Sequence, residues 1–294
     1  MPAAGVCLIP LNDRPELVEV ASQTDGTFLV NGAKTGGRRW CSVSSFTIPY
    51  GDPLFEPPPL EGYVLSAEAD TLGKWEELLS RVGPLLKLCP TTSLLVSSFG
   101  SFLLPLMPSP TGAHLSVSFK HRPGIIYASW SQNALEVFEA IVHEADHQCL
   151  FEVINEDGLL RDVPSNYRAA FRSPWRDDPR PLSGLFFGFS AFVTVGVSMA
   201  NLVRAGVAGS DYGGRRAVLA LEQAVDAISV VTDHGLLSAR GEEVLEYNRA
   251  QALETLRKLE THSGSELWKA ASRERREKDE ARWRNAHGSE INVS

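Results

Sequence analysis

Short β-type apolar runs broken by glycine and proline dominate the first part of the chain, and longer helical patterns follow after residue 130. The runs that predict strands cover residues 27–30, 39–48, 93–97, 115–119 and 124–128. One helix interrupts them, with a capped start at Ser66. Up to Pro90 its apolar residues recur at helical spacing, namely Leu72, Trp75, Leu78, Leu79, Val82 and Leu86.

The second part of the chain predicts a bundle of helices. A polar, proline-containing loop is expected at 155–181, after the first of them. The expected helices lie near 132–153, 183–205, 213–233, 239–261 and 265–285. The fold class is therefore α+β and mainly α: a small N-terminal sheet with one helix, then a helical bundle. We expect an N-terminal α+β region at 1–130 and a helical region at 131–294, joined in one integrated domain.

The most apolar stretch, residues 182–203, approaches the length of a membrane span. Small and polar residues interrupt it throughout, among them Gly184, Gly188, Gly196 and Asn201. Small residues permit close packing of neighbouring helices, so we expect a central buried helix and no membrane span.

The composition indicates which partners and which cellular compartment to expect. The 294 residues include 43% hydrophobic and 22% charged residues, as in ordinary globular proteins. The net charge of −8 disfavours a nucleic-acid partner, because phosphate neutralisation needs excess lysine and arginine. The four cysteines are scattered without a C-x-x-C pair, which indicates reduced thiols and a cytoplasmic protein.

The strongest chemical signal is H-E-A-D-H at residues 143–147, within the first helix of the bundle. On a helix, His143 and His147 project from one face one turn apart, where both rings can bind a divalent transition metal. In zinc peptidases, the glutamate at the position of Glu144 acts as general base. The alternative is that both histidines satisfy hydrogen bonds in the core.

The motif supplies two metal ligands, whereas a catalytic metal usually takes three from the protein. A third histidine six residues after the second is absent, because that position is Val153. The stretch 166–169 also lacks the glutamate of thermolysin-like enzymes. Three later residues are candidates for the third ligand, although each also suits an ordinary surface or capping role: Glu222, Asp226 and His234.

Three segments together suggest a family: G-I-I-Y at 124–127, E-A-I-V-H-E-A-D-H-Q at 139–148 and S-P-W-R-D-D-P-R-P-L-S-G at 173–184. The chain resembles, over roughly residues 115–205, the HExxH-motif peptide-modification proteins of ribosomal peptide biosynthesis. The resemblance implies an iron(II)- and 2-oxoglutarate-dependent oxygenase that β-hydroxylates a residue of a precursor peptide, its partner. It also shifts the expected metal from zinc to iron.

The resemblance further suggests residue roles and one departure. A guanidinium suits the distal carboxylate of 2-oxoglutarate, so Arg176 and Arg180 are the candidates, unless they pair with the neighbouring aspartates. Trp175 would form an aromatic wall or simply pack. Many relatives carry a histidine, a candidate third ligand, where this chain has Phe187.

Two further functions therefore stay open. The first is a zinc-dependent peptide hydrolase in which Glu144 is the general base. The second is a non-catalytic relative that binds a peptide, as the loss of a ligand at Phe187 suggests.

Overall fold

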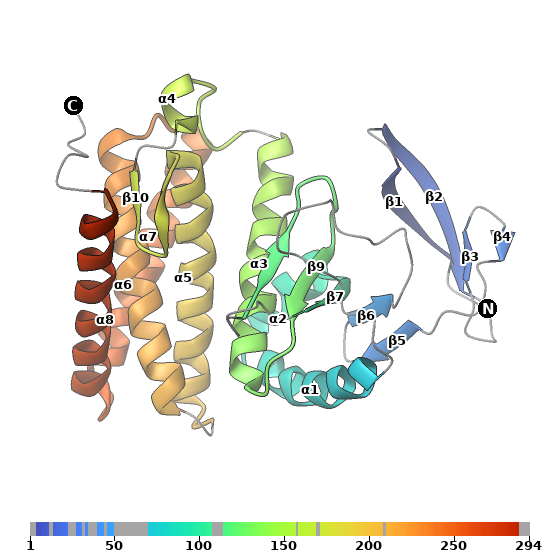
Figure 1. Cartoon of the computed structure of the whole chain (residues 1–294), viewed down its shortest axis with the longest axis horizontal. Coiled ribbons are helices and arrows are strands. Elements are labelled where there is room, and N and C mark those ends of the chain that lie inside the picture. The colour runs from blue at the N-terminus through green and yellow to red at the C-terminus, as the bar shows by residue number, and fades with distance from the viewer. Residues whose placement is uncertain are drawn as a thin grey trace. The chain divides into compact units, whose positions relative to one another are not determined.

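The computed structural model describes residues 70–107, 114–156, 158–168, 171–207 and 210–287, together with the backbone of strands between residues 4 and 49. The chain divides into two compact units, Met1–Gln148 and Cys149–Ser294, and the division falls within helix α3 (Ala134–Glu156). The architecture is α+β and mainly helical (Figure 1), as the sequence predicts.

Unit 1 begins with two sets of strands. The first four strands form an antiparallel sheet in the order β1 (Ala4–Leu11), β2 (Arg14–Ser22), β3 (Phe28–Val30) and β4 (Ala33–Lys34). Next come β5 (Trp40–Val43) and β6 (Phe46–Pro49), which pair antiparallel. The strand expected at 27–30 is confirmed by β3, and the single run expected at 39–48 is divided into the two antiparallel strands β5 and β6. The sequence patterns did not predict β1 or β2.

Helices α1 (Asp70–Lys87) and α2 (Pro90–Phe99) follow. Helix α1 is the amphipathic helix predicted up to Pro90, and it buries Trp75, Leu78, Leu79, Val82 and Leu86. The predicted start at Ser66 lies outside the described residues. The strand predicted at 93–97 is wrong, because these residues belong to α2. Pro90 stands in the first turn of α2, where a helix tolerates proline. Thr92 and Val96 lie four residues apart and are buried on one face of this helix.

A five-stranded sheet completes unit 1, in the order β5-β6-β7-β9-β8. Strand β7 (Phe102–Leu106) runs parallel to β9 (Ile125–Ser129), and β8 (Ser116–Ser118) pairs antiparallel with β9 at the edge. Both β8 and β9 confirm predicted strands, whereas β7 was not predicted. The core of this sheet contains Leu104, Leu106, Ile125 and Tyr127.

Helix α3 begins at a set of polar side chains. The Asn133 Oδ1 accepts a hydrogen bond from the Leu135 amide at 3.0 Å, which satisfies one of the first N–H groups of the helix. The Ser131 hydroxyl binds the Glu136 carboxylate at 2.6 Å, and Glu136 reaches back to the Asn133 side chain. These contacts fix the start of the helix that carries the histidines.

The prediction of a loop throughout residues 155–181 is wrong. This segment contains the short helix α4 (Pro164–Tyr167) and a hairpin of β10 (Phe171–Ser173) with β11 (Arg176–Arg180). Strand β11 reads R-D-D-P-R and lacks the apolar alternation that would predict a strand. The buried Asn166 holds α4 in place, because its side chain exchanges hydrogen bonds of 2.9 and 3.1 Å with the Leu236 backbone.

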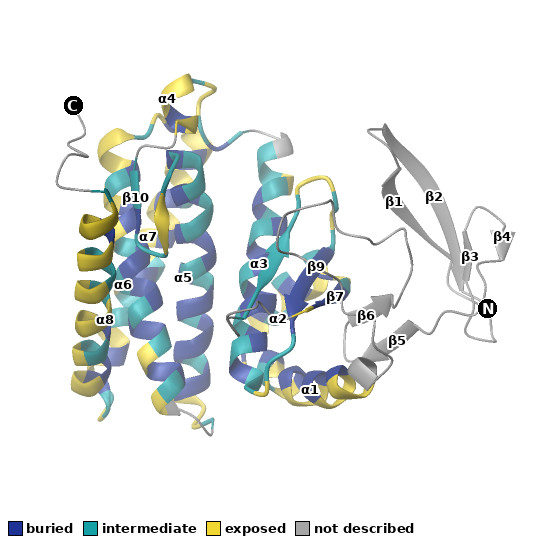
Figure 2. Cartoon of the chain, viewed as in Figure 1, coloured by how far each residue is buried: buried dark blue, intermediate teal, exposed yellow. Residues whose placement is uncertain are grey.

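Four long helices form the rest of unit 2: α5 (Leu182–Arg204), α6 (Ser210–His234), α7 (Ala239–Glu260) and α8 (Ser265–His287). All four predicted helices are confirmed. Helix α5 packs against α6 and α7, and α8 packs against α6. Helix α5 is long and apolar enough to cross a membrane, yet 61% of its most apolar window is buried inside the structure, as in the core helix of a bundle (Figure 2).

Candidate metal centre

The two motif histidines lie side by side on α3. Their ring centroids are 4.5 Å apart and the ring planes meet at 76°. Two imidazoles that bind one ion at about 2.1 Å have ring centres about 5 Å apart. The observed separation of the two rings is close to that value.

The His147 side chain is partly buried, and this burial lowers its pKa. Desolvation, and then the positive charge of a protonated His143, hold the pKa of His147 well below its usual value. The ring is therefore neutral at physiological pH, and a neutral imidazole is the form that coordinates a metal.

Glu144, between the two histidines, is held by two serines of β8. The Ser116 hydroxyl donates to one carboxylate oxygen and the Ser118 hydroxyl donates to the other, both at 2.7 Å. The side chain is only 3% exposed. Burial raises the pKa of Glu144 to about 7, and the serine hydrogen bonds only partly oppose that rise.

One helical turn later, Gln148 holds the turn that joins β8 to β9. Its amide nitrogen donates to the carbonyl oxygens of Phe119, Arg122 and Ile125 at 3.2–3.4 Å. Its oxygen accepts from the Gly124 amide at 3.2 Å. Glu144 and Gln148 thus bind the β8–β9 hairpin.

Sequence reasoning missed Ser116, Ser118 and Gln148. A signal was present in the S-V-S of β8, because serines two apart on a strand lie on one face. Val117 points to the other face and packs on the sheet core.

Among the described residues, no group of three His, Cys, Asp or Glu side chains is arranged to hold a metal ion. The candidates Glu222 and Asp226 instead attach α8 to α6. Glu222 accepts from the Ser272 hydroxyl at 2.6 Å, and Arg276 contacts Glu222 at 3.2 Å and Asp226 at 2.6 Å. The ring of the third candidate, His234, lies 5.4 Å from that of Phe171.

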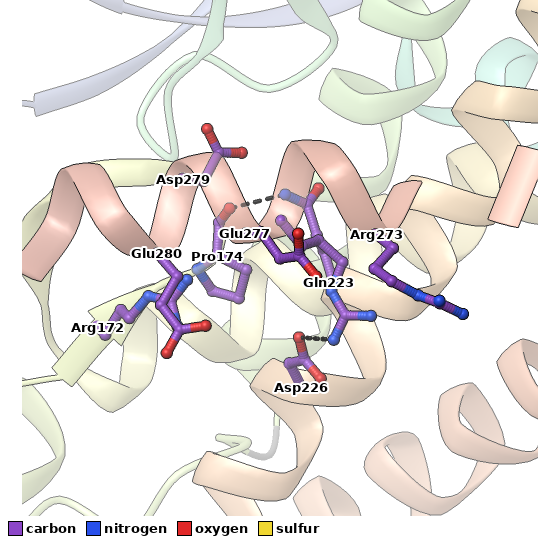
Figure 3. A pocket seen from close by; sticks show the side chains of 9 residues that line it. Arg172, Pro174, Gln223, Asp226, Arg273, Glu277, Asp279 and Glu280 are labelled. Carbon is purple, nitrogen blue, oxygen red and sulfur yellow. Dashed lines mark hydrogen bonds and ion pairs between the residues drawn. The ribbon is translucent and has the colours of Figure 1, made fainter. Parts of the chain in front are cut away.

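Asp226 also lines a polar pocket of about 210 Å³ in unit 2 (Figure 3). The pocket lies against the end of β10 and between α6 and α8. The side chain of Gln223 reaches across it to the Pro174 carbonyl at 2.8 Å. Both basic and acidic side chains line it: Arg172, Arg273 and Arg276 with Asp226, Glu277, Asp279 and Glu280. This mixture of charges is typical of a solvated groove between helices.

The Phe187 side chain packs against another aromatic side chain. Its ring lies 5.2 Å from that of Phe151, a later residue of α3. The position where the resemblance expects a histidine therefore packs against another aromatic ring.

The two candidate arginines share one aspartate. Arg176 and Arg180 contact the two carboxylate oxygens of Asp178 at 2.9 and 3.1 Å. Desolvation opposes ionisation of Asp178, but the hydrogen bond and charge of Arg176 and the charge of Arg180 outweigh it and lower its pKa. This pairing is the alternative that the sequence left open for both arginines.

Trp175 packs on α5. Its ring stacks on that of Phe192 at 4.7 Å and 18°, and the guanidinium of Arg216 lies 5.2 Å from the Phe192 ring. Gly188 permits this approach, because a Cβ there would lie 2.5 Å from the Trp175 ring. Trp175 thus anchors the β10–β11 hairpin.

No protein-family model and no curated protein sequence matches this chain.

Proposed function

We propose that this chain is a metal-dependent enzyme whose ion is bound by His143 and His147. The observation that carries the proposal is the pair of rings 4.5 Å apart, on one face of α3. Partial burial and a low pKa at His147 support it, because they favour the coordinating form of the ring.

The activity that we propose is the one that the H-E-x-x-H and S-P-W-R-D-D-P-R-P segments suggest by resemblance: hydroxylation of a β-carbon in a ribosomally synthesised precursor peptide. Iron(II), bound with 2-oxoglutarate, would supply the oxidising chemistry, in which oxygen is consumed and succinate and carbon dioxide are released. Among the residues that the structure describes, no third His, Cys, Asp or Glu side chain joins the two histidines in such a set.

The chain's own residues would bind and orient the reactants. His143 and His147 would hold two adjacent coordination positions and leave others for 2-oxoglutarate and oxygen. Arg180, with a side chain 32% exposed against 59% for Arg176, is the better candidate for gripping the distal carboxylate of 2-oxoglutarate. To do so, Arg180 would have to leave Asp178 and pair with the carboxylate of the co-substrate instead.

The test is a turnover assay with the precursor peptide encoded beside the gene. The protein is loaded with iron(II), 2-oxoglutarate and peptide without oxygen, and air is then admitted. We expect stoichiometric succinate and a peptide heavier by one oxygen atom. Absence of both products from a protein that has bound iron would rule out this activity.

A zinc-dependent peptide hydrolase is the second candidate, favoured by the pKa of about 7 at Glu144. A carboxylate with such a pKa is suited to accept a proton near neutral pH. This function predicts zinc-dependent cleavage of the peptide that Glu144→Gln abolishes. Intact peptide after incubation with the zinc-loaded protein would exclude it.

The third candidate is a non-catalytic peptide-binding protein, favoured by the packing of Phe187 against Phe151. It predicts peptide binding without any bound iron or zinc. Stoichiometric metal that is lost in His143→Ala would argue against it.

A further inference from the structure

We propose that Glu144 is a positioning residue, which together with Ser116, Ser118 and Gln148 clamps α3 to the β8–β9 hairpin and so fixes the direction in which His143 and His147 project from that hairpin. The inference rests on the metal site proposed above. It gives Glu144 a role that differs from the general base of zinc peptidases.

The first part of the clamp is a carboxylate bridged by two hydroxyls. Ser116 and Ser118 lie on the same face of β8, and each donates to a different oxygen of Glu144 at 2.7 Å. Strand β8 is itself paired in register with β9, with Ser116 opposite Ala128 and Ser118 opposite Ile126. The strand therefore presents both donors at fixed positions to one buried carboxylate.

The second part of the clamp lies one turn further along α3. Gln148 is 2% exposed and makes four hydrogen bonds to the hairpin backbone, three in the turn between β8 and β9 and one at Ile125, the first residue of β9. Residues four apart share a helical face, so Glu144 and Gln148 form a single polar stripe that binds one hairpin. Two attachments a turn apart fix both the rotation of α3 about its axis and its position along the hairpin.

The histidines depend on that rotation. With 3.6 residues per turn, His143 and His147 lie about 100° and about 60° from Glu144 around the helix, both in the same direction. A rotation of α3 would carry the two rings away from their present direction together. The clamp thus acts on the ion through the helix, and Glu144 need not touch the ion.

Glutamine and an apolar residue at position 144 should affect the clamp differently. In Glu144→Gln, the amide oxygen can accept from one serine, and the amide nitrogen can donate to the hydroxyl oxygen of the other. The clamp is then preserved without a carboxylate. Glu144→Leu and the double variant S116A/S118A remove the bridge.

The experiment is calorimetric titration of the full chain with Zn²⁺ as the probe. We expect Glu144→Gln to bind within about threefold of the native affinity, and Glu144→Leu and S116A/S118A to bind about tenfold more weakly, as is usual when residues supporting metal ligands are removed. Amide hydrogen exchange in α3 should accelerate in the two weak binders and not in Glu144→Gln.

Ser131→Ala is the matched control, because it removes another serine–glutamate hydrogen bond of the same helix, from Ser131 to Glu136. It should lower the melting temperature without weakening Zn²⁺ binding. Circular dichroism checks that each variant is folded. If the double variant is unfolded, Ser116→Ala and Ser118→Ala are titrated singly, and each is expected to weaken binding.

The outcomes separate the two proposals. Native affinity in folded S116A/S118A, or loss of binding in Glu144→Gln alone, would overturn the clamp while leaving the metal site intact. Native affinity in His143→Ala would instead overturn the metal site itself.

Discussion

The histidine motif of α3 and the arginine hairpin β10–β11 hold their ionisable groups in different ways. In the motif, burial raises the pKa of Glu144 to about 7, although the hydroxyls of Ser116 and Ser118 donate hydrogen bonds to the carboxylate and partly oppose the rise. In the hairpin, Asp178 is exposed and lies between two guanidiniums, so its pKa falls. Burial without a counter-charge leaves a group able to change its protonation near neutral pH, whereas a local ion pair fixes its charge. The motif therefore holds a carboxyl group that can change its protonation near neutral pH, whereas the ion pairs of the hairpin keep Asp178 charged.

The largest effect that this comparison predicts is on metal binding. His143→Ala or His147→Ala should weaken binding of iron(II) by more than about 100-fold, because one ligand cannot hold the ion as two do. The measurement is anaerobic calorimetry or metal analysis after gel filtration. His262→Ala is the control, since that ring stacks on Trp268 in unit 2. Equal losses in all three variants would indicate a general defect in folding.

The next effect is a pH dependence of stability caused by Glu144. Its pKa is raised from 4.5 to about 7, so between these values the folded protein binds a proton that the unfolded chain has released. The contribution of Glu144 to the free energy of unfolding is therefore fully present below pH 4.5, and it is lost as the pH rises through 7. A shift of this size corresponds to about 3 kcal/mol. Denaturant unfolding of the wild type and Glu144→Gln from pH 4.5 to 8 measures it, and a constant difference between the two would contradict the buried, uncompensated state of Glu144.

Packing of the hairpin gives a smaller effect. In Gly188→Ala, the new Cβ would lie 2.5 Å from the Trp175 ring, so we expect the free energy of unfolding to fall by about 2 kcal/mol. Gly184→Ala on the same helix is the control, because its Cβ would meet Pro181 at an ordinary 3.5 Å and should alter stability by less than about 1 kcal/mol. Thermal unfolding compares them. Equal stability would mean that Trp175 does not anchor the hairpin.

The smallest effect concerns the ion pairs of the hairpin. Arg176→Ala should change the free energy of unfolding by less than about 0.5 kcal/mol, because the pair with Asp178 is exposed to solvent. In the turnover assay, Arg180→Ala should raise the KM for 2-oxoglutarate about tenfold and Arg176→Ala should not. An unchanged KM in both variants would remove the hairpin from the proposed co-substrate site and would sharpen its contrast with the motif.

The sequence by itself determined the elements that have a strong local signal. Helix α1 repeats apolar residues at helical spacing over several turns, and α3 and α5–α8 were also predicted, with boundaries that differ from the observed ones by only a few residues. The placement of His143 and His147 on one helical face is equally local, because it depends only on their separation along a helix.

Only the tertiary structure decided the features that depend on contacts between distant residues. Short polar segments such as β11, and the apolar run that became α2, carry too few residues for a period to be decisive. The bridge from Ser116 and Ser118 to Glu144 joins residues 26 and 28 positions apart in the chain. Whether a carboxylate in this motif is buried, what donates to it and where its pKa lies all depend on the strand packed beside it, and no spacing along the sequence specifies that neighbour.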